Sequence, residues 1–218
     1  METTEKEYMD FITSNEVEND KLLRYKESKD TIVVPSKIKS LSNYAFRNNF
    51  KAKKILLSPM LKEIEDGEIQ EAMTIEERDS FVGCFSGCIN LKQIVLSKKL
   101  DRLPACVFSN CATLEKVFVQ SDLKEIDKMA FYGCASLQEI NLPNSLEMIK
   151  MYAFYNCISL KVLFIPKSVK YIGKYAFSGM TSAQTLVFEC KEEEQQNFHW
   201  SWKEGAECKV IWNYSLRK

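Results

Sequence analysis

The sequence predicts an α/β repeat solenoid: a right-handed coil with one parallel β-sheet along one side, a short helical cap at the N-terminus and an irregular cap at the C-terminus. Three observations support this prediction. Apolar residues recur with a fixed 23-residue period, the period holds over most of the chain, and both ends depart from it. A fixed period of about 20–50 residues is the sequence signature of stacked structural repeats.

The period is clearest in four consecutive segments, which begin at Leu91, Leu114, Leu137 and Leu160, so that successive residue numbers differ by 23. Phenylalanines keep the same spacing at Phe85, Phe108, Phe131, Phe154 and Phe177. A single coil of this length cannot bury its own apolar side, whereas stacked coils share one continuous core. We therefore expect the phenylalanines to form a buried column.

The same spacing divides the chain into a central array and two caps. The residue numbers of Ile32 and Ile55 also differ by 23, whereas those of Ile55 and Ile94 differ by 39, which is one period plus 16. The extra residues fall in an acidic insertion at about residues 65–80. We expect six full coils and an irregular seventh, with the N-terminal cap over residues 1–30, the array over 31–188 and the C-terminal cap over 189–218.

Each coil begins with the pattern L-x-x-I-x-L, whose inward residues alternate with the period of two that a strand requires. Serine or proline follows the strand, as at Ser97 and Pro143. Proline cannot donate to a strand ladder, so it suits the place where pairing stops. Later in the coil, Gly or Asn recurs at Gly87, Asn110, Gly133, Asn156 and Gly179. These residue types tolerate positive φ, which predicts a tight turn.

The full pattern, L-x-x-I-x-L-P-x-S-[LV]-x-x-I-x-x-x-A-F-x-x-C, resembles the BspA-like leucine-rich repeats of bacterial and protist proteins. Residues Leu137–Cys157 match it almost letter for letter, and the resemblance extends over about residues 32–188. The resemblance implies a right-handed leucine-rich-repeat coil. It also implies an association with surface adhesion and host-protein binding, although fold alone does not determine function.

The ends are expected to shield the core from water, as the terminal repeats of a solenoid must. Tyr8, Phe11 and Ile12 have helical spacing after a capping Thr4, which predicts a short covering helix. At the other end, residues 191–202 predict a helical turn or loop in which Trp200 and Trp202 pack against the core. Residues 207–212 predict a last strand.

Composition argues against several classes of function. Thirty basic and thirty acidic residues leave no net charge, whereas a general nucleic-acid binder is usually basic. No phosphate-binding or nucleophile motif is present. We therefore expect no enzymatic activity, no cofactor, no metal, no nucleic-acid partner and no small-molecule substrate.

No stretch is long and apolar enough to be a signal peptide or a membrane span. This favours a cytoplasmic location, with the cell surface or secretion by an unrecognised route as the alternative.

Cysteine and histidine are the candidate reactive groups. Cys88, Cys111, Cys134 and Cys157 recur at the repeat spacing, which favours a column of small buried side chains over a disulfide chain or a metal site. His199 lies nine residues from both Cys190 and Cys208. A cysteine–histidine catalytic pair there is the weaker alternative, because no orienting carboxylate is marked out.

The strongest functional candidate is the outward face of the predicted strands. One outward residue lies between the two inward residues of each coil, and most of these residues are bulky and apolar. The set is Leu56, Val95, Phe118, Asn141, Phe164 and Val187. An aligned apolar stripe of this kind is typical of an interaction surface, although such residues also simply suit a strand.

The sequence therefore predicts a non-enzymatic module that binds a protein partner through this face. Two alternatives remain open. The chain could be a structural repeat protein that associates with a second copy of itself, or a surface adhesin-like protein without its leader. The acidic insertion is a second candidate contact, because insertions in solenoids often lie on the binding side.

Overall fold

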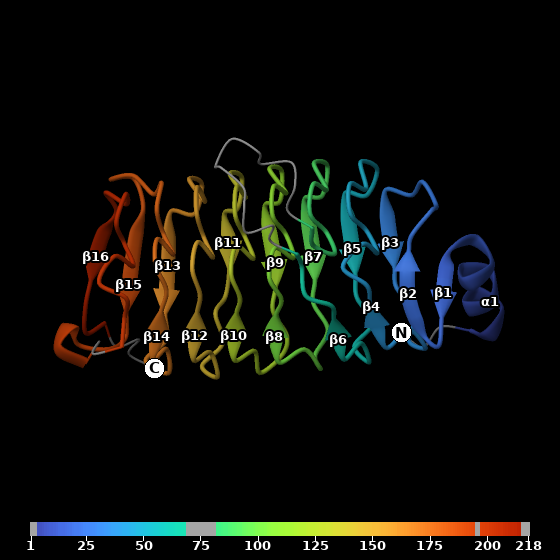
Figure 1. The fold of residues 1–218 in the computed structure, drawn as a ribbon, viewed down its shortest axis with the longest axis horizontal. Helices are drawn as coiled ribbons and strands as arrows, with labels where there is room; N and C mark the ends of the chain where they lie inside the picture. Colours follow the sequence, from blue (N-terminus) through green and yellow to red (C-terminus); the bar gives the residue numbers. More distant parts are fainter. Residues whose placement is uncertain (1–3, 69–81, 195–196, 215–218) are drawn as a thin grey trace.

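The computed structural model describes residues 4–68, 82–194 and 197–214. The chain winds into an elongated coil with two rows of short strands along its length (Figure 1). Apart from the two strands at each end of the chain, strands of one row alternate along the chain with strands of the other, so each central coil contributes one strand to each row. Successive coils are joined by parallel pairing. The predicted parallel-strand solenoid is confirmed.

The first row contains the strands predicted from the L-x-x-I-x-L pattern. They are β3 (Thr31–Val33), β5 (Lys54–Leu56), β7 (Gln93–Val95), β9 (Lys116–Phe118), β11 (Glu139–Ile140), β13 (Val162–Ile165), β15 (Thr185–Phe188) and β16 (Lys209–Ile211). Ile94 is in register with Ile55 on one side and Val117 on the other, as the repeat spacing requires.

Pairing divides this row into two sheets, one from β3 to β11 and one from β13 to β16. The break follows β11, which has two residues and is the shortest strand of the row. Asn141 comes directly after it, and asparagine is depleted in strands. The expectation of a single continuous sheet was therefore wrong on this side of the coil.

The return limb forms a second row of strands that the sequence analysis did not predict. It consists of β1 (Glu16–Glu18), β2 (Lys21–Arg24), β4 (Ser40–Leu41), β6 (Glu63–Ile64), β8 (Arg102–Leu103), β10 (Glu125–Ile126), β12 (Met148–Ile149) and β14 (Tyr171–Ile172). The buried leucines and isoleucines of successive coils pair in register, as Leu103 does with Ile126. Since the described residues contain one α-helix, the coil is better described as a β-solenoid than as an α/β repeat.

The insertion leaves the coil where the second row is interrupted. β6 pairs with β4 and β8 pairs with β10, but the described residues show no ladder between β6 and β8. Glu68 and Val82 form an antiparallel bridge, and the Gly67 N–H donates to the Ala105 carbonyl at 3.1 Å. The bridge pairs the two ends of the insertion with each other, and the Gly67 bond joins one of them to the array. Most of the predicted insertion, residues 69–80, lies outside the described residues.

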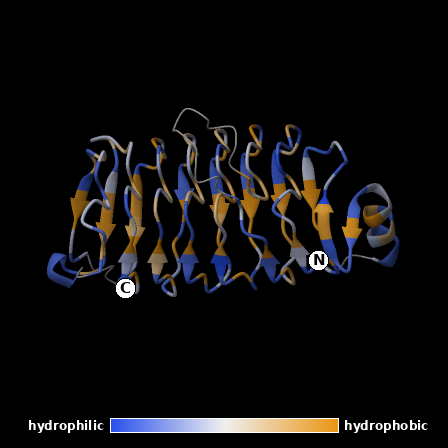
Figure 2. Ribbon diagram, in the orientation of Figure 1, coloured by the Kyte–Doolittle hydropathy of each residue, from blue (hydrophilic) through white to orange (hydrophobic). Residues whose placement is uncertain are grey.

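A column of phenylalanines runs through the interior, as predicted. Phe46, Phe85, Phe108, Phe131, Phe154 and Phe177 are at most 1% exposed. Neighbouring rings stack with centroids 5.2–5.8 Å apart. Colouring by hydropathy shows apolar residues within the strands of the first row, whereas several short strands of the second row are hydrophilic (Figure 2).

The predicted glycine and asparagine turns have positive φ, from 57° at Asn156 to 84° at Gly179. At Gly133 a Cβ atom would lie 2.7 Å from Asn110 Oδ1 of the preceding coil, so only glycine fits without a shift. Tyr152 and Tyr175 also have positive φ, 56° and 55°. Tyrosine carries no sequence signal for this conformation, so these positions were not predicted.

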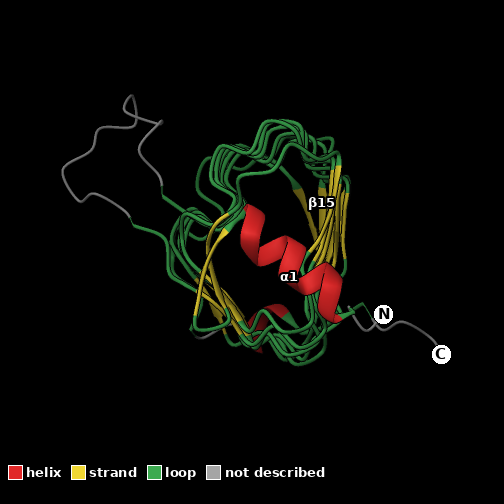
Figure 3. Ribbon diagram, turned by 90° about the vertical axis from the view of Figure 1, so that its right-hand side faces the viewer, coloured by secondary structure: helices red, strands yellow, loops and turns green. Residues whose placement is uncertain are grey.

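Both caps cover the ends of the core. Helix α1 (Glu5–Ser14) begins at Thr4, which forms a capping box with Glu7, and Phe11 on its inner side is buried. The helix lies across the N-terminal end of the coil, between the two rows (Figure 3). At the C-terminal end a short 3-10 helix, η2 (Glu192–Glu194), precedes β16.

The two tryptophans of the C-terminal cap, Trp200 and Trp202, differ in their burial. Trp202 is buried and meets the Phe177 ring edge-on at 5.8 Å. Trp200 is 82% exposed, so the expectation that it packs against the core was wrong. The two tryptophans are two residues apart in a turn, and only one of them can face inward.

Candidate interaction surface

Five of the six predicted stripe residues lie on the outer face of the first row, away from the core. Leu56 and Val95 are half-buried, Phe118 is 40% exposed, Asn141 is exposed and Phe164 is 44% exposed. The register pairs Leu56 with Val95 and Val95 with Phe118, so these side chains form one column across successive strands. We call Leu56, Val95, Phe118, Asn141 and Phe164 the outer stripe.

Val187 is the exception, because it is 5% exposed and contributes almost no surface. It is paired with Phe164 on one side and with Ile211 on the other. The Tyr214 ring lies 5.7 Å from the Phe164 ring, so the C-terminal segment reaches over the strand that carries Val187. The prediction that Val187 faces solvent was wrong, because it took no account of this segment.

The structure adds three exposed apolar residues to those of the outer stripe. Val33 extends the stripe column at its N-terminal end, since it is in register with Leu56 and is 57% exposed. Its position, one repeat period before Leu56, could have identified it. Val162 and Ile158 are 46% and 49% exposed near Phe164 in the chain. Ile158 lies in a turn, where the strand pattern gives no information.

Asn141 divides the outer stripe into two apolar parts. Leu56, Val95 and Phe118 form the first part, and Phe164 with Val162 forms the second. Asn141 lies between them in the sequence at the repeat spacing, beside the break that follows β11. A partner that contacts both parts would have to cover this amide and supply it with hydrogen bonds.

Charged side chains border the stripe and neutralise one another. In the neighbouring outward column Lys116 forms an ion pair with Glu139 at 2.8 Å, and Lys92 pairs with Glu115 at 3.2 Å nearby. Hydrogen bonding to Glu139 raises the pKa of Lys116, which keeps the ammonium group charged at neutral pH. An apolar centre with a polar rim is the usual composition of a protein interface.

The suggested cysteine–histidine pair has no activated thiol in the structure. His199 Nδ1 accepts from the Ser201 backbone N–H at 3.1 Å and lies 2.9 Å from Ser201 Oγ. Cys190 and Cys208 are buried, and desolvation raises the pKa of both thiols. A thiol with a raised pKa is a poor nucleophile, because the reactive form is the thiolate.

The ladder cysteines are fully buried, and each thiol makes a contact with the preceding coil. Cys111 Sγ lies 2.9 Å from the Phe85 carbonyl oxygen, and Cys134 Sγ lies 3.1 Å from that of Phe108. The thiol therefore donates a weak hydrogen bond between coils, in addition to its packing. Among the described residues no three His, Cys, Asp or Glu side chains are grouped closely enough to hold a metal ion.

We expect all eight cysteines to be free thiols. Counting thiols in denaturant without reductant should give eight per chain, because every cysteine is unpaired and buried. In the native protein the same reagent should react slowly with Cys111, Cys134 and Cys157. A count of four or fewer would contradict the packing of this column.

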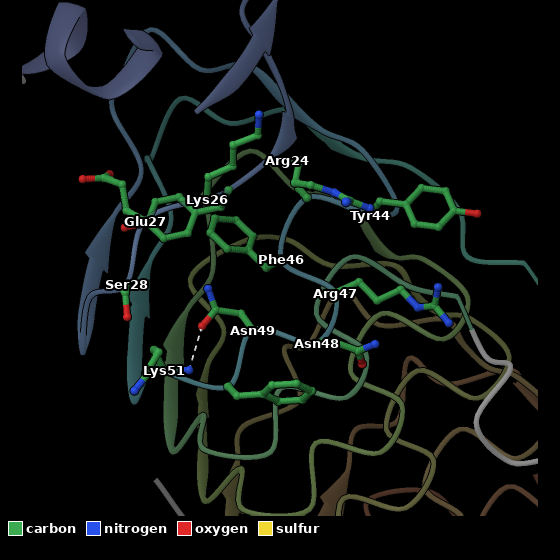
Figure 4. Close-up of a pocket in the computed structure, with 13 residues that line it drawn as sticks. Arg24, Lys26, Glu27, Ser28, Tyr44, Phe46, Arg47, Asn48, Asn49 and Lys51 are labelled. Carbon is green, nitrogen blue, oxygen red and sulfur yellow. Dashed lines mark hydrogen bonds between the residues drawn. The ribbon is translucent and has the colours of Figure 1, made fainter. Parts of the chain in front are cut away.

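A pocket of about 520 Å³ lies near the N-terminal end, between residues 24–28 and the turn at residues 44–51 (Figure 4). Arg24, Lys26, Arg47 and Lys51 line it. Figure 4 shows that Arg47 points away from the centre of the pocket, and Lys26 is already paired with Glu16 at 2.7 Å. The cationic groups do not converge on one point, so the pocket is not built to hold an anion.

A comparison with known protein families identifies the family to which these repeats belong. The chain matches the BspA type leucine rich repeat region, in six copies, over residues 16–79 and 82–201. The chain belongs to the BspA-type leucine-rich repeat family. The predicted resemblance is therefore confirmed, and the family match includes the coil interrupted by the insertion.

Two solved structures similar to this BspA-type protein come from bacteria. A leucine-rich repeat protein from Eubacterium ventriosum is 22% identical, with a TM-score of 0.57 over 74% of this chain and 46% of that chain. A leucine rich cell surface protein from Faecalibacterium prausnitzii is 19% identical, with a TM-score of 0.49 over 78% of this chain and 50% of that one. The chain thus spans about half the length of these two structures.

A comparison with curated proteins gave no match. Within the described part of this BspA-type protein, no helix is both long enough and apolar enough to cross a membrane. The likeness to the Eubacterium ventriosum structure supports the fold of the chain and does not establish its function.

Proposed function

We propose that the protein is a non-enzymatic binding module that docks a protein partner on the outer stripe of the first row of strands. The observation that carries this proposal is the exposure of two phenyl rings on one face, Phe118 at 40% and Phe164 at 44%. Exposed apolar groups aligned on one surface are typical of interaction sites, and aromatic residues often contribute most of the binding energy.

The spacing of the two rings supports a single partner element. Phe118 and Phe164 are separated by two repeat periods. Paired strands lie ~4.8 Å apart, and the second step, from β11 to β13, crosses the break between the two sheets, so the two Cα atoms lie about 10 Å apart or somewhat more. A helix or a strand of a partner can contact both rings at once.

The test is the double variant Phe118→Ser/Phe164→Ser. Partners are captured from cells that contain the protein, identified by their loss with the variant, and then measured individually against purified protein. We expect the variant to weaken association by about 2 kcal/mol or more, roughly 30-fold, the scale on which anchor residues act. Because both rings are partly exposed, the free energy of unfolding should fall by no more than about 1–1.5 kcal/mol.

Tyr171→Ser is the matched control. Tyr171 is an aromatic residue of similar exposure, 37%, in strand β14 of the opposite row. This variant should bind as the wild type does. A folded double variant that binds normally would contradict the proposal and would leave the acidic insertion as the better candidate.

Light scattering over a concentration series identifies whether the partner is a second copy. A mass that rises with concentration in the wild type and stays monomeric in the double variant would assign the stripe to self-association. A monomeric wild type would assign it to a different protein. Self-association that persists in the double variant would contradict docking on the stripe.

A further inference from the structure

The two rows of strands end differently at the N-terminus of the coil. The second row is closed by β1, which pairs antiparallel with β2. In the first row β3 pairs with β5 on one side, and the described residues supply no strand on the other. Figure 3 looks onto this end and shows α1 crossing it obliquely, without a strand beside the first row.

The open edge of β3 presents specific backbone groups. The Asp30 carbonyl accepts from the Lys54 N–H at 3.0 Å, and the Val34 N–H donates to the Leu56 carbonyl at 3.0 Å. In a parallel strand, alternate residues direct both backbone groups to the same neighbour. The N–H and C=O groups of Thr31 and Val33 therefore point away from β5. Both residues are exposed.

A groove of about 570 Å³ runs along this edge. One wall is the strand, with Lys29, Thr31, Val33 and Pro35. The other wall is one side of α1, formed by Thr4, Glu7, Asp10, Phe11 and Ser14. An edge strand facing a helix across a groove is a geometry that takes an extended peptide as an added strand.

The groove is acidic. Glu7 and Asp10 contribute from the helix, and Glu27 contributes from the segment before β3. Lys29 is paired with Glu27 at 2.6 Å and neutralises that carboxylate. It does not neutralise the negative charges of Glu7 and Asp10 on the helix side of the groove. Hydrogen bonds from Thr4 lower the pKa of Glu7, which keeps it ionised. The charge of the groove favours a cationic ligand.

We propose that this groove binds an extended basic peptide segment, which pairs with β3 as an additional strand at the N-terminal edge of the first row. The peptide backbone pairs with the free groups of Thr31 and Val33. Side chains alternate between the two faces of a strand. A peptide in which apolar and basic residues alternate therefore directs its apolar side chains outward beside Val33, where they continue the apolar column. The cationic residues lie within reach of the carboxylates on α1.

The probe is a six-residue blocked peptide of alternating lysine and valine, titrated into the full protein at low salt. The decisive readout is amide hydrogen exchange followed by NMR. The Thr31 and Val33 amides should exchange at least tenfold more slowly with saturating peptide, because they gain hydrogen bonds. The Ile32 amide already faces β5 and should change less than twofold.

A charge reversal in the groove supplies the second test. Asp10→Lys should weaken binding of the lysine–valine peptide at least fivefold and should improve binding of a glutamate–valine peptide. Glu18→Lys is the matched control. Glu18 is an exposed carboxylate at the same end of the coil that does not line the groove, and this variant should bind within twofold of the wild type.

Two results would overturn the proposal. Binding without protection of Thr31 and Val33 would show that the peptide adsorbs only through charge. An equal effect of Asp10→Lys and Glu18→Lys would show that the acidic end acts as a whole. The site is separate from the outer-stripe phenylalanines, so the variant Phe118→Ser/Phe164→Ser should retain peptide binding. If the peptide does not bind the groove, the proposed function of the outer stripe is unaffected.

Discussion

Phe131→Ala is expected to lower the free energy of unfolding by about 3–5 kcal/mol, the range for removing an aromatic side chain from a packed core. Phe131 is fully buried, and its ring stacks on Phe108 at 5.3 Å and on Phe154 at 5.2 Å. The substitution therefore opens a cavity and removes contacts from two coils at once. Urea unfolding of the two proteins measures the difference.

Phe118→Ala is the control for this prediction. It removes the same ring from a position that is 40% exposed, so its cost should be about 1 kcal/mol or less. Equal losses for the two variants would mean that the phenylalanine column contributes no more to stability than the outer face does. This result would contradict the stacked-coil core.

The protein is expected to lose stability steeply between pH 8 and pH 10. Burial raises the pKa of Cys84, Cys111, Cys134 and Cys157, so these thiols stay protonated in the fold. In the unfolded chain they ionise above about pH 8.5, and at pH 10 each stabilises that state by about 2 kcal/mol, or about 8 kcal/mol for the four together. The folded pKa lies above the unfolded pKa, so the stability contributed by the thiols is complete below about pH 8 and is lost as pH rises through the unfolded pKa towards the folded one.

Urea unfolding in reductant at pH 8, 9 and 10 measures this dependence. Cys134→Ser is the matched variant, because serine is close in size and can donate to the Phe108 carbonyl but does not titrate. Its stability should fall less steeply between pH 9 and pH 10, by up to about 1.4 kcal/mol per pH unit, the value of one proton. A wild-type stability that is unchanged from pH 8 to pH 10 would show that the thiols are accessible in the fold.

The interior of the coil could be predicted from the sequence, because the 23-residue period places equivalent residues of successive coils next to one another. Phe108, Ile94 and Cys111 were assigned to the core in this way. The capping helix followed from Thr4 and the spacing of Phe11. The second row of strands was missed because two-residue strands such as β8 are too short to show alternation. The division of the first row was missed because it depends on Asn141 and on pairing between coils.

The surface was less predictable than the core. Alternation along each strand placed Phe118 and Phe164 outward, but it could not show that the segment ending in Tyr214 returns to cover Val187. It also gave no sign of the groove at the edge of β3. That groove depends on how α1 crosses the end of the coil, which is a property of packing and not of the repeat.

Site-specific photo-crosslinking tests the central claim most directly. A benzophenone side chain replaces Phe118 in one protein and Tyr171 in another, and both are irradiated with the partner or at a concentration that favours self-association. We expect a covalent product from position 118 and none from position 171, which lies in the opposite row. A product from position 171 alone, or equal yields from both positions, would contradict binding through the outer stripe.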